Sequence, residues 1–324
     1  MDMNQIKNFA PIIIPTLNRF EHLKKCIESL SLCTHASCTD LIIGVDFPPS
    51  EKYMNGYNKI IDYLESGING FKSIRVIKHE KNMGAKGNSD FLKKIAFRQY
   101  DKIILTEDDN VFSPNFLDFM NKTLSIFEYD CQVTSVTGYS MVEFASLELS
   151  NNIIFTKNNS AWGIGLWKNK EKEYNNINVN YYKKILYNNA NVIKLIRLYP
   201  AVLLMLIDML RKGTFYGDTM RTCRNIIEGY FQVCPHKSLV RNLGHDGSGL
   251  HCGNMYNDYF SKQNIDTEEI FKIRDINIQY NKSIKNIERR FSMPKNRFKR
   301  FLRYIRILLE ILKYRTSQTC NIRY

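Results

Sequence analysis

The chain has 324 residues, 44% of them apolar and 12% aromatic, enough to bury a substantial core in one large domain or in one domain with an appendage. It carries 46 basic and 32 acidic residues, and this net charge of +14 favours nucleic acid, an anionic membrane surface or a phosphorylated substrate as partner. The composition excludes a disordered chain, and no uncharged apolar run is long enough to predict a transmembrane span.

The eight cysteines contain no C-x-x-C pair, and no secretory signal opens the chain. We therefore expect reduced thiols in a cytoplasmic protein. A zinc site is not favoured, because zinc ligands usually cluster at short spacings.

Strands and helices are predicted to alternate along the first half of the chain. Short apolar runs rich in β-branched residues predict strands at residues 11–15, 40–46, 74–77, 103–105 and 132–137, with helices between them. This alternation predicts an α/β fold with a doubly wound, mainly parallel sheet flanked by helices. Because such sheets bind ligands at the carboxyl ends of their strands, the residues just after each strand are the candidates for a site.

Polar residues follow the first three predicted strands. The first strand ends in the turn T-L-N-R at residues 16–19, and the second ends at Asp46, whose carboxylate could accept a hydrogen bond from a ribose hydroxyl or uracil. After the third strand, two glycines flank Lys86 in N-M-G-A-K-G-N, which ends at Asn88. Such a segment could present N–H groups and an ammonium to a diphosphate, or be a plain glycine-rich turn; it lacks P-loop spacing.

The acidic triplet Glu107-Asp108-Asp109 directly follows the fourth predicted strand. Adjacent carboxylates repel each other, and holding them together normally requires a cation. Hard oxygen ligands select Mg²⁺ or Mn²⁺. A solvated acidic turn is the alternative, but the position after a buried strand favours a metal site.

The second half of the chain holds three further candidate segments. Both tryptophans, Trp162 and Trp167, lie in W-G-I-G-L-W, where indole faces could stack on sugar rings or pack in the core. Asp218 stands at a predicted helix N-terminus, as a general base for an acceptor hydroxyl or as an N-cap, with Glu228 in reserve. The stretch from 236 to 252 reads HKSLVRNLGHDGSGLHC and contains a loop of the kind that can close over phosphates.

Taken together, these segments resemble a known family over residues 11–252. In their order, I-I-I-P-T-x-N-R, the glycine-lysine segment, E-D-D, W-G-x-x-x-W and the final N-x-G-x-D segment are similar to GT-A glycosyltransferases, which use nucleotide-sugar donors. The E-D-D form is similar to that of N-acetylglucosaminyltransferase I and of bacterial family-2-like sugar transferases. The resemblance implies a GT-A-like fold. It also implies a catalytic domain at 1–255, with nucleotide-sugar and acceptor halves meeting near residue 140, and a helical extension at 256–324.

The resemblance also implies a role for each candidate residue. Asp109 would ligate Mn²⁺ or Mg²⁺, and His251 could be a metal or diphosphate ligand. Asp218 would be the catalytic base. The residues implied at the donor are Thr16, Arg19, Asp46, Lys86, Asn88, Glu107 and Asp108, and those implied at the acceptor are Trp162, Trp167, His245 and Asp246.

From residue 289 onward the chain is basic. A stripe at i, i+3, i+4 spacing predicts an amphipathic helix that either lies on an anionic membrane or packs against the catalytic domain. The stripe consists of Phe298, Phe301, Leu302, Ile305, Leu308, Leu309 and Leu312.

The sequence thus predicts a metal-dependent, inverting glycosyltransferase that moves a sugar, with a UDP-sugar favoured as donor, to a hydroxyl of a glycan or lipid-linked acceptor. The expected setting is cell-surface polysaccharide synthesis at the inner face of a bacterial membrane, with no nucleic-acid partner. A sugar-phosphate nucleotidyltransferase remains an alternative, although residues 16–19 lack the glycine-rich loop of that class. The other alternative is a non-catalytic basic module that binds a membrane surface or nucleic acid.

Overall fold

The computed structural model describes residues 8–149, 152–247, 260, 262–291 and 293–320. Eight of its strands form one sheet in the order β3-β2-β1-β4-β8-β6-β9-β7. They are β1 (Ile12–Thr16), β2 (Asp40–Val45), β3 (Ser73–Lys78), β4 (Lys102–Leu105), β6 (Val133–Thr137), β7 (Ile153–Thr156), β8 (Ile164–Trp167) and β9 (Phe231–Pro235). Two short strands, β5 (Asn110–Phe112) and β10 (Val240–Asn242), form a second, antiparallel sheet.

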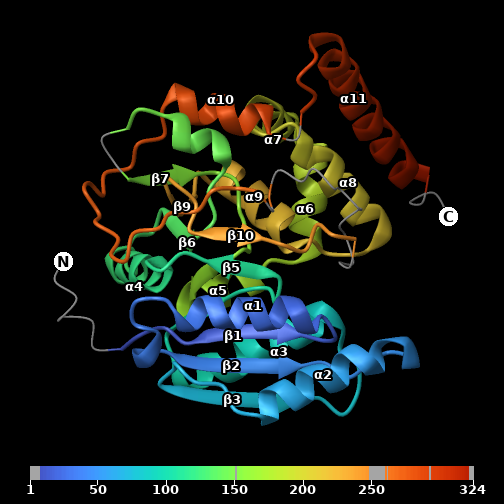
Figure 1. Cartoon of the computed structure of the whole chain (residues 1–324). Coiled ribbons are helices and arrows are strands. Elements are labelled where there is room, and N and C mark those ends of the chain that lie inside the picture. Colours follow the sequence, from blue (N-terminus) through green and yellow to red (C-terminus); the bar gives the residue numbers. More distant parts are fainter. Residues whose placement is uncertain (1–7, 150–151, 248–259, 261, 292, 321–324) are drawn as a thin grey trace.

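Helices cover both faces of the large sheet and continue beyond it (Figure 1). The helices are α1 (Phe20–Ser31), α2 (Met54–Glu65), α3 (Gly84–Gln99), α4 (Phe116–Ile126), α5 (Lys168–Asn175), α6 (Val179–Tyr187), α7 (Asn189–Leu198), α8 (Ala201–Lys212), α9 (Gly217–Glu228), α10 (Lys282–Arg290) and α11 (Arg297–Cys320). Within the described residues, none of them combines the length and the apolar character needed to cross a membrane.

The pleat of β1 explains why helices are needed on both faces. Ile12 and Ile14 belong to the buried cluster that includes α1 and α4, while Ile13 belongs to a smaller cluster with Leu92 of α3. Side chains on both faces of this strand are therefore removed from water, which is the usual situation of a parallel strand in an α/β protein. The fold is α/β, with a mainly parallel sheet between helices, as the sequence predicts.

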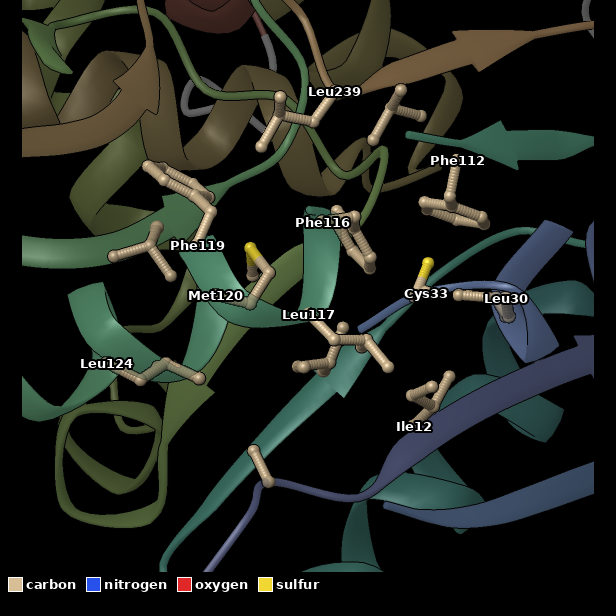
Figure 2. Packing of buried hydrophobic residues seen from close by; sticks show 14 of the residues in the cluster. Ile12, Leu30, Cys33, Phe112, Phe116, Leu117, Phe119, Met120, Leu124 and Leu239 are labelled. Carbon is tan, nitrogen blue, oxygen red and sulfur yellow. The ribbon is translucent and has the colours of Figure 1, made fainter. Parts of the chain in front are cut away.

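Helix α4 links the sheet to the rest of the molecule (Figure 2). Phe116 packs against Phe112 with ring centroids 4.4 Å apart, and Figure 2 shows Leu239 above Phe116 and Phe119. Leu117 turns towards Ile12 of β1. The turn that carries the acidic triplet lies between β4 and β5, and β5 leads directly into this packed helix.

The strand order contains one insertion that the sequence analysis did not predict. β8 lies between β4 and β6 and runs antiparallel to both. β6 and β9 are parallel to each other, and β7 closes the sheet antiparallel to β9. The carboxyl ends of β1, β2, β4, β6 and β9 therefore share one edge, and both halves of the chain contribute to it.

A second hydrophobic cluster lies outside the sheet and joins α6, α7, α8, α9, α10 and α11 to β7 and β9. Residues 198–210 are mostly apolar, and their helix α8 belongs to this cluster, where Leu203, Leu206 and Met209 are buried. The residues before α10 also pack inwards, since Lys122 Nζ of α4 donates to the Phe271 carbonyl at 2.9 Å. The C-terminal segment is therefore packed against the rest of the molecule through several contacts.

Candidate functional site

The parallel strands bring three predicted segments to one edge of the sheet. The Asp46 N–H donates to the carbonyl of Thr16 at 2.9 Å, and the Thr106 N–H donates to the carbonyl of Ile13 at 3.1 Å. Thr16, Asp46 and the acidic triplet thus follow three neighbouring strands, as expected for a site in an open α/β sheet.

A guanidinium lies between two of the acidic side chains. Arg19 Nη1 is 2.7 Å from Asp109 Oδ2, and Arg19 Nη2 pairs with Asp108 Oδ1. Thr16 Oγ1 donates to the other oxygen of Asp108 at 2.7 Å. The side chains of Asp108 and Asp109 are only 5% and 8% exposed, so two nearly buried carboxylates share one cation.

The pKa values of this group reflect burial and pairing. Burial tends to lower the pKa of Arg19, but the neighbouring Asp108 and Asp109 outweigh it and raise that pKa above its ordinary value. Burial raises the pKa of Asp108, and Arg19 opposes this rise. Arg19 is therefore held in its charged form, and the two carboxylates depend on it for charge balance.

The loop after β10 packs directly on this pair. Asn242 Nδ2 donates to Asp109 Oδ1 at 2.7 Å, and the Leu243 N–H donates to the Asp109 carbonyl at 2.8 Å. A Cβ on Gly244 would lie 2.0 Å from Asp109 Oδ2 and 3.2 Å from Arg19 Nη1. Only a residue without a side chain fits here, so the loop fixes Asp109 from the side opposite to β4.

Asp218 comes to the same site from α9. Burial is the main cause that raises the pKa of Glu107, followed by repulsion from Asp109 and then from Asp218. Such repulsion requires proximity, although Asp218 is far from the triplet in sequence. Burial raises the pKa of Asp218 itself to about 6, and hydrogen bonding from Asn159 opposes the rise.

A buried amide network holds Asp218 in place. Asn159 Nδ2 donates to Asp218 Oδ1 at 2.8 Å. Gln232 Nε2 of β9 donates to Asn159 Oδ1 at 3.1 Å and to Ser135 Oγ of β6 at 3.0 Å. Neither Asn159 nor Gln232 lies in a recognisable motif, so neither could be predicted from the sequence. The antiparallel pairing of β7 with β9 brings Asn159 to Gln232, and the parallel pairing of β6 with β9 adds Ser135.

Two of the predicted donor residues instead support the backbone. Asp46 is 3% exposed, and its Oδ1 accepts from the N–H groups of Phe47 at 3.0 Å and Met83 at 2.8 Å. Asn88 is 1% exposed, and its Nδ2 donates to the Gly44 carbonyl at 2.8 Å. The prediction that Asn88 and Asp46 contact the donor directly is not supported by this geometry; they position the turn before α3.

Lys86 contacts residues outside the acidic triplet. Its ammonium pairs with Asp90 on the exposed side of α3. It lines a cavity of about 470 Å³ together with Lys93, Lys168 and Lys172, whose lining includes none of the acidic triplet. The predicted contact of Lys86 with a diphosphate therefore stays without structural support.

The two tryptophans have different environments. Trp167 is 1% exposed, and its Nε1–H donates to the Leu124 carbonyl at 2.9 Å, so the prediction that it contacts the acceptor is wrong and it is a core residue. Trp162 is partly buried in an aromatic group, with ring centroids 4.7 Å from Tyr139, 5.2 Å from Phe260 and 6.0 Å from His245. The structure therefore brings Trp162 and His245 together, and their contact with an acceptor stays a prediction.

The remaining candidates fall in three places. Asp246 Oδ2 is 3.3 Å from His22 Nε2 of α1, close to the loop that holds Asp109. Glu228 is exposed at the far end of α9, about 15 Å along the helix from Asp218, and it accepts a hydrogen bond from Tyr181 at 2.5 Å. It is therefore a poor substitute for Asp218. His251 lies outside the described residues.

The oxygen atoms at the acidic triplet are of the type that binds a hard divalent cation. Carboxylate oxygens are the ligands that Mg²⁺ and Mn²⁺ prefer, and Asp108 and Asp109 supply them. All four of these oxygens accept a hydrogen bond from Arg19, Thr16 or Asn242. Among the residues that the structure describes, no group of three or more potential ligands gathers. A cation would bind Asp109 by replacing the guanidinium of Arg19.

No family model matches the sequence, and no curated protein matches it. Among solved structures, the chain is similar to S. aureus TarS at 14% identity and a TM-score of 0.30, over 40% of this chain and 21% of TarS. It is similar to TarS 1–349 in complex with UDP at 14% identity and a TM-score of 0.33, over 52% and 49% of the two chains.

The chain is also similar to the mannosyltransferase PcManGT from Pyrobaculum calidifontis in complex with GDP-Man and Mn²⁺. This likeness has 10% identity and a TM-score of 0.38, over 71% of this chain and 56% of that one. The chain thus spans between 21% and 56% of the length of these proteins. At these identities and TM-scores, the likenesses assign no substrate and no residue role to this chain.

Proposed function

We propose that this protein is a metal-dependent glycosyltransferase that moves a sugar from a nucleotide-sugar donor, with a UDP-sugar favoured, to a hydroxyl of a glycan or lipid-linked acceptor. The observation that carries the proposal is the pairing of Arg19 with Asp109 at the carboxyl edge of the sheet, supported by the repulsion between Glu107 and Asp218 from a third distant segment. The reaction is proposed to invert the anomeric centre, because Asp218 would act as a base and not as a nucleophile.

Asp218 is proposed to act as the general base. Its carboxylate would take the proton of the acceptor hydroxyl as the hydroxyl oxygen attacks the anomeric carbon. A pKa raised to about 6 makes it a stronger base than an ordinary aspartate while leaving it mostly ionised at neutral pH. Asn159 donates to Oδ1 of this carboxylate, and the backbone of Ala161 also hydrogen-bonds to it, so the carboxylate is held in a fixed orientation.

Asp109, with Asp108 beside it, would hold the divalent cation. A bound Mn²⁺ or Mg²⁺ would neutralise charge that develops on the leaving diphosphate. Arg19, once released from Asp109, has a guanidinium suited to bind a phosphate, and Thr16 keeps Asp108 oriented. Glu107, which precedes these two carboxylates, is proposed to lie on the nucleotide side of the site.

The acceptor is proposed to lie on the side of Trp162 and His245. Aromatic faces stack on the apolar faces of sugar rings, and this group is held by Tyr139 and Phe260. A growing cell-surface polysaccharide or its lipid-linked precursor would offer such rings. The setting would be the cytoplasmic face of a bacterial membrane.

The proposal can be tested by titrating the protein with UDP-, GDP-, CMP- and dTDP-sugars, with and without Mn²⁺, while following thermal unfolding and slow sugar release. A ligand at 100 times its dissociation constant stabilises a protein by about 2.7 kcal/mol. We expect one nucleotide class to stabilise the protein in a metal-dependent way. Asp109→Ala should abolish this effect.

Asp101→Ala is the matched control. It removes a carboxylate at the other end of β4, where the side chain is 86% exposed, and should leave donor binding unchanged. Release of pyrophosphate in place of free sugar would instead identify a nucleotidyltransferase. A folded protein that no nucleotide sugar stabilises would refute the assignment as an enzyme of this class.

A further inference from the structure

Helix α11 exposes a continuous row of large apolar side chains. At about 100° per residue, the seven members of the predicted stripe fall within an arc of about 120° on the helix. Their exposed fractions are 68% for Phe298, 60% for Phe301, 47% for Leu302, 38% for Ile305, 51% for Leu308, 51% for Leu309 and 57% for Leu312. None of these residues is packed against the catalytic domain, so that alternative for the stripe is wrong.

A different face of α11 attaches the helix to the protein. Ile307, Ile311 and Tyr314 are almost fully buried in the cluster formed with α6 and α8. Arg211 Nη1 of α8 pairs with Glu310 Oε2 at 2.6 Å, and Arg315 Nε donates to the Leu186 carbonyl at 2.6 Å. The helix is therefore fixed in rotation, and the stripe is directed away from the protein.

Basic residues border the apolar arc. Lys299, Arg306 and Lys313 lie along one border and Arg297 along the other, and all four are exposed. The only acidic residue from 297 to 320 is Glu310, which turns towards Arg211. A partner for this face must therefore be apolar in its centre and negatively charged at its border.

A membrane surface with anionic headgroups has both properties. An amphipathic helix lies in the interface plane with its apolar face about 5–10 Å deep, while lysines and arginines meet the headgroups. A second copy of the chain would instead bring positive borders together, because both copies carry the same residues, and such like charges repel. Charge therefore favours lipid over self-association.

We propose that the exposed stripe of α11 is a docking surface for an anionic lipid bilayer, with the helix parallel to the membrane plane. This inference does not depend on the sugar-transfer reaction, since it uses no residue of the acidic triplet. It accounts for part of the net positive charge of the chain. It also gives the protein a fixed orientation on the membrane, because the opposite face of α11 belongs to the core.

The test is co-sedimentation of the 324-residue chain with phosphatidylcholine vesicles, with and without phosphatidylglycerol. We expect binding to the anionic vesicles that weakens at high ionic strength. Replacing Lys299, Arg306 and Lys313 together by glutamine should weaken it about 100-fold, at about fivefold for each charge. The double variant Phe301→Glu, Leu308→Glu should abolish it.

Leu32→Glu with Ile270→Glu is the matched control, because it adds the same two charges at side chains that are 78% and 56% exposed elsewhere. It should bind like the wild type. All variants change exposed side chains, so their unfolding temperatures should remain close to that of the wild type; truncation before α11 would not, since it removes buried residues. The proposal is overturned if the wild type ignores anionic vesicles or if Phe301→Glu, Leu308→Glu binds them equally well. It is also overturned if the protein is a dimer, and Phe301→Glu, Leu308→Glu dissociates this dimer without loss of vesicle binding.

Discussion

Removing the guanidinium between Asp108 and Asp109 is expected to make the stability of the protein depend on metal and on pH. Arg19→Gln deletes the charge that balances two carboxylates whose side chains are 5% and 8% exposed. Glutamine is shorter than arginine but keeps a hydrogen-bond donor. The variant therefore removes the charge and leaves a neutral polar side chain in its place.

The size of the effect follows from burial. Removing one partner of a buried ion pair costs about 3–5 kcal/mol, because the other charge remains buried without compensation. The side chain of Arg19 is itself 22% exposed, so the low end of the range applies, about 3 kcal/mol at neutral pH. At about 2 °C per kcal/mol for a large domain, the unfolding temperature should fall by about 6 °C.

The sign of the pH dependence follows from the carboxylates. Burial already raises the pKa of Asp108, and loss of Arg19 removes the main influence that opposes this rise. A carboxyl group with a raised pKa stabilises the folded state at low pH, and this contribution is lost as the pH rises through that pKa. The deficit of Arg19→Gln should therefore be largest at pH 8 and shrink at pH 5.

Thermal unfolding at pH 5 and pH 8, with and without Mn²⁺, measures all of these effects. Mn²⁺ should restore much of the stability lost at pH 8, because a divalent ion supplies the missing charge, and it should stabilise the variant more than the wild type. Arg75→Gln, at an exposed arginine of β3, is the control and should change little. If Arg19→Gln unfolds like the wild type at pH 8 without metal, the inference that Arg19 balances the two carboxylates is refuted.

Three further predictions test other parts of the site. Asp218→Asn should lower kcat about 10²–10⁴-fold while donor binding is retained. The wild-type rate should fall as the pH drops through about 6, because a base must be ionised to accept a proton, and a pH–rate profile of both proteins measures these effects. Gly244→Ala should weaken metal-dependent donor binding in a titration, because its Cβ would meet Asp109 Oδ2 at 2.0 Å. Trp167→Ala should lower the free energy of unfolding by about 3–5 kcal/mol in urea, as a buried side chain with a hydrogen bond to Leu124 is lost.

The part of the site that follows β1, β2 and β4 could be predicted, because its sequence patterns lie within short continuous segments. β1, β2 and β4 are short, buried, β-branched runs, and each is followed at once by the polar residues of interest. A parallel pairing then places those residues on one edge whatever the details of the connections. The positions of Thr16 and of Asp109 follow from that rule alone.

The other half could not be predicted, because its structure depends on long-range pairing. β8 reads as a glycine-rich ligand segment, yet it is inserted between β4 and β6, where Trp167 fills the core. Residues 175–191 are rich in Asn, Tyr and Lys and read as an exposed insertion, yet α6 buries Tyr182 and Leu186. A helix with a single apolar face is hard to recognise in a polar segment, because the helices that cover this face are distant in sequence.

The second, two-stranded sheet explains how the two halves of the site are held together. β5 continues directly from the acidic triplet, and β10 pairs with it so that Asn242 lies beside Asn110. From that position Asn242 reaches Asp109, and the following residue pins the Asp109 backbone. Three paired residues on each strand thus tie the loop with Gly244 and His245 to the end of β4. The same loop contacts Asp109 through Gly244 and Trp162 through His245, so it joins the acidic triplet to the aromatic side of the site.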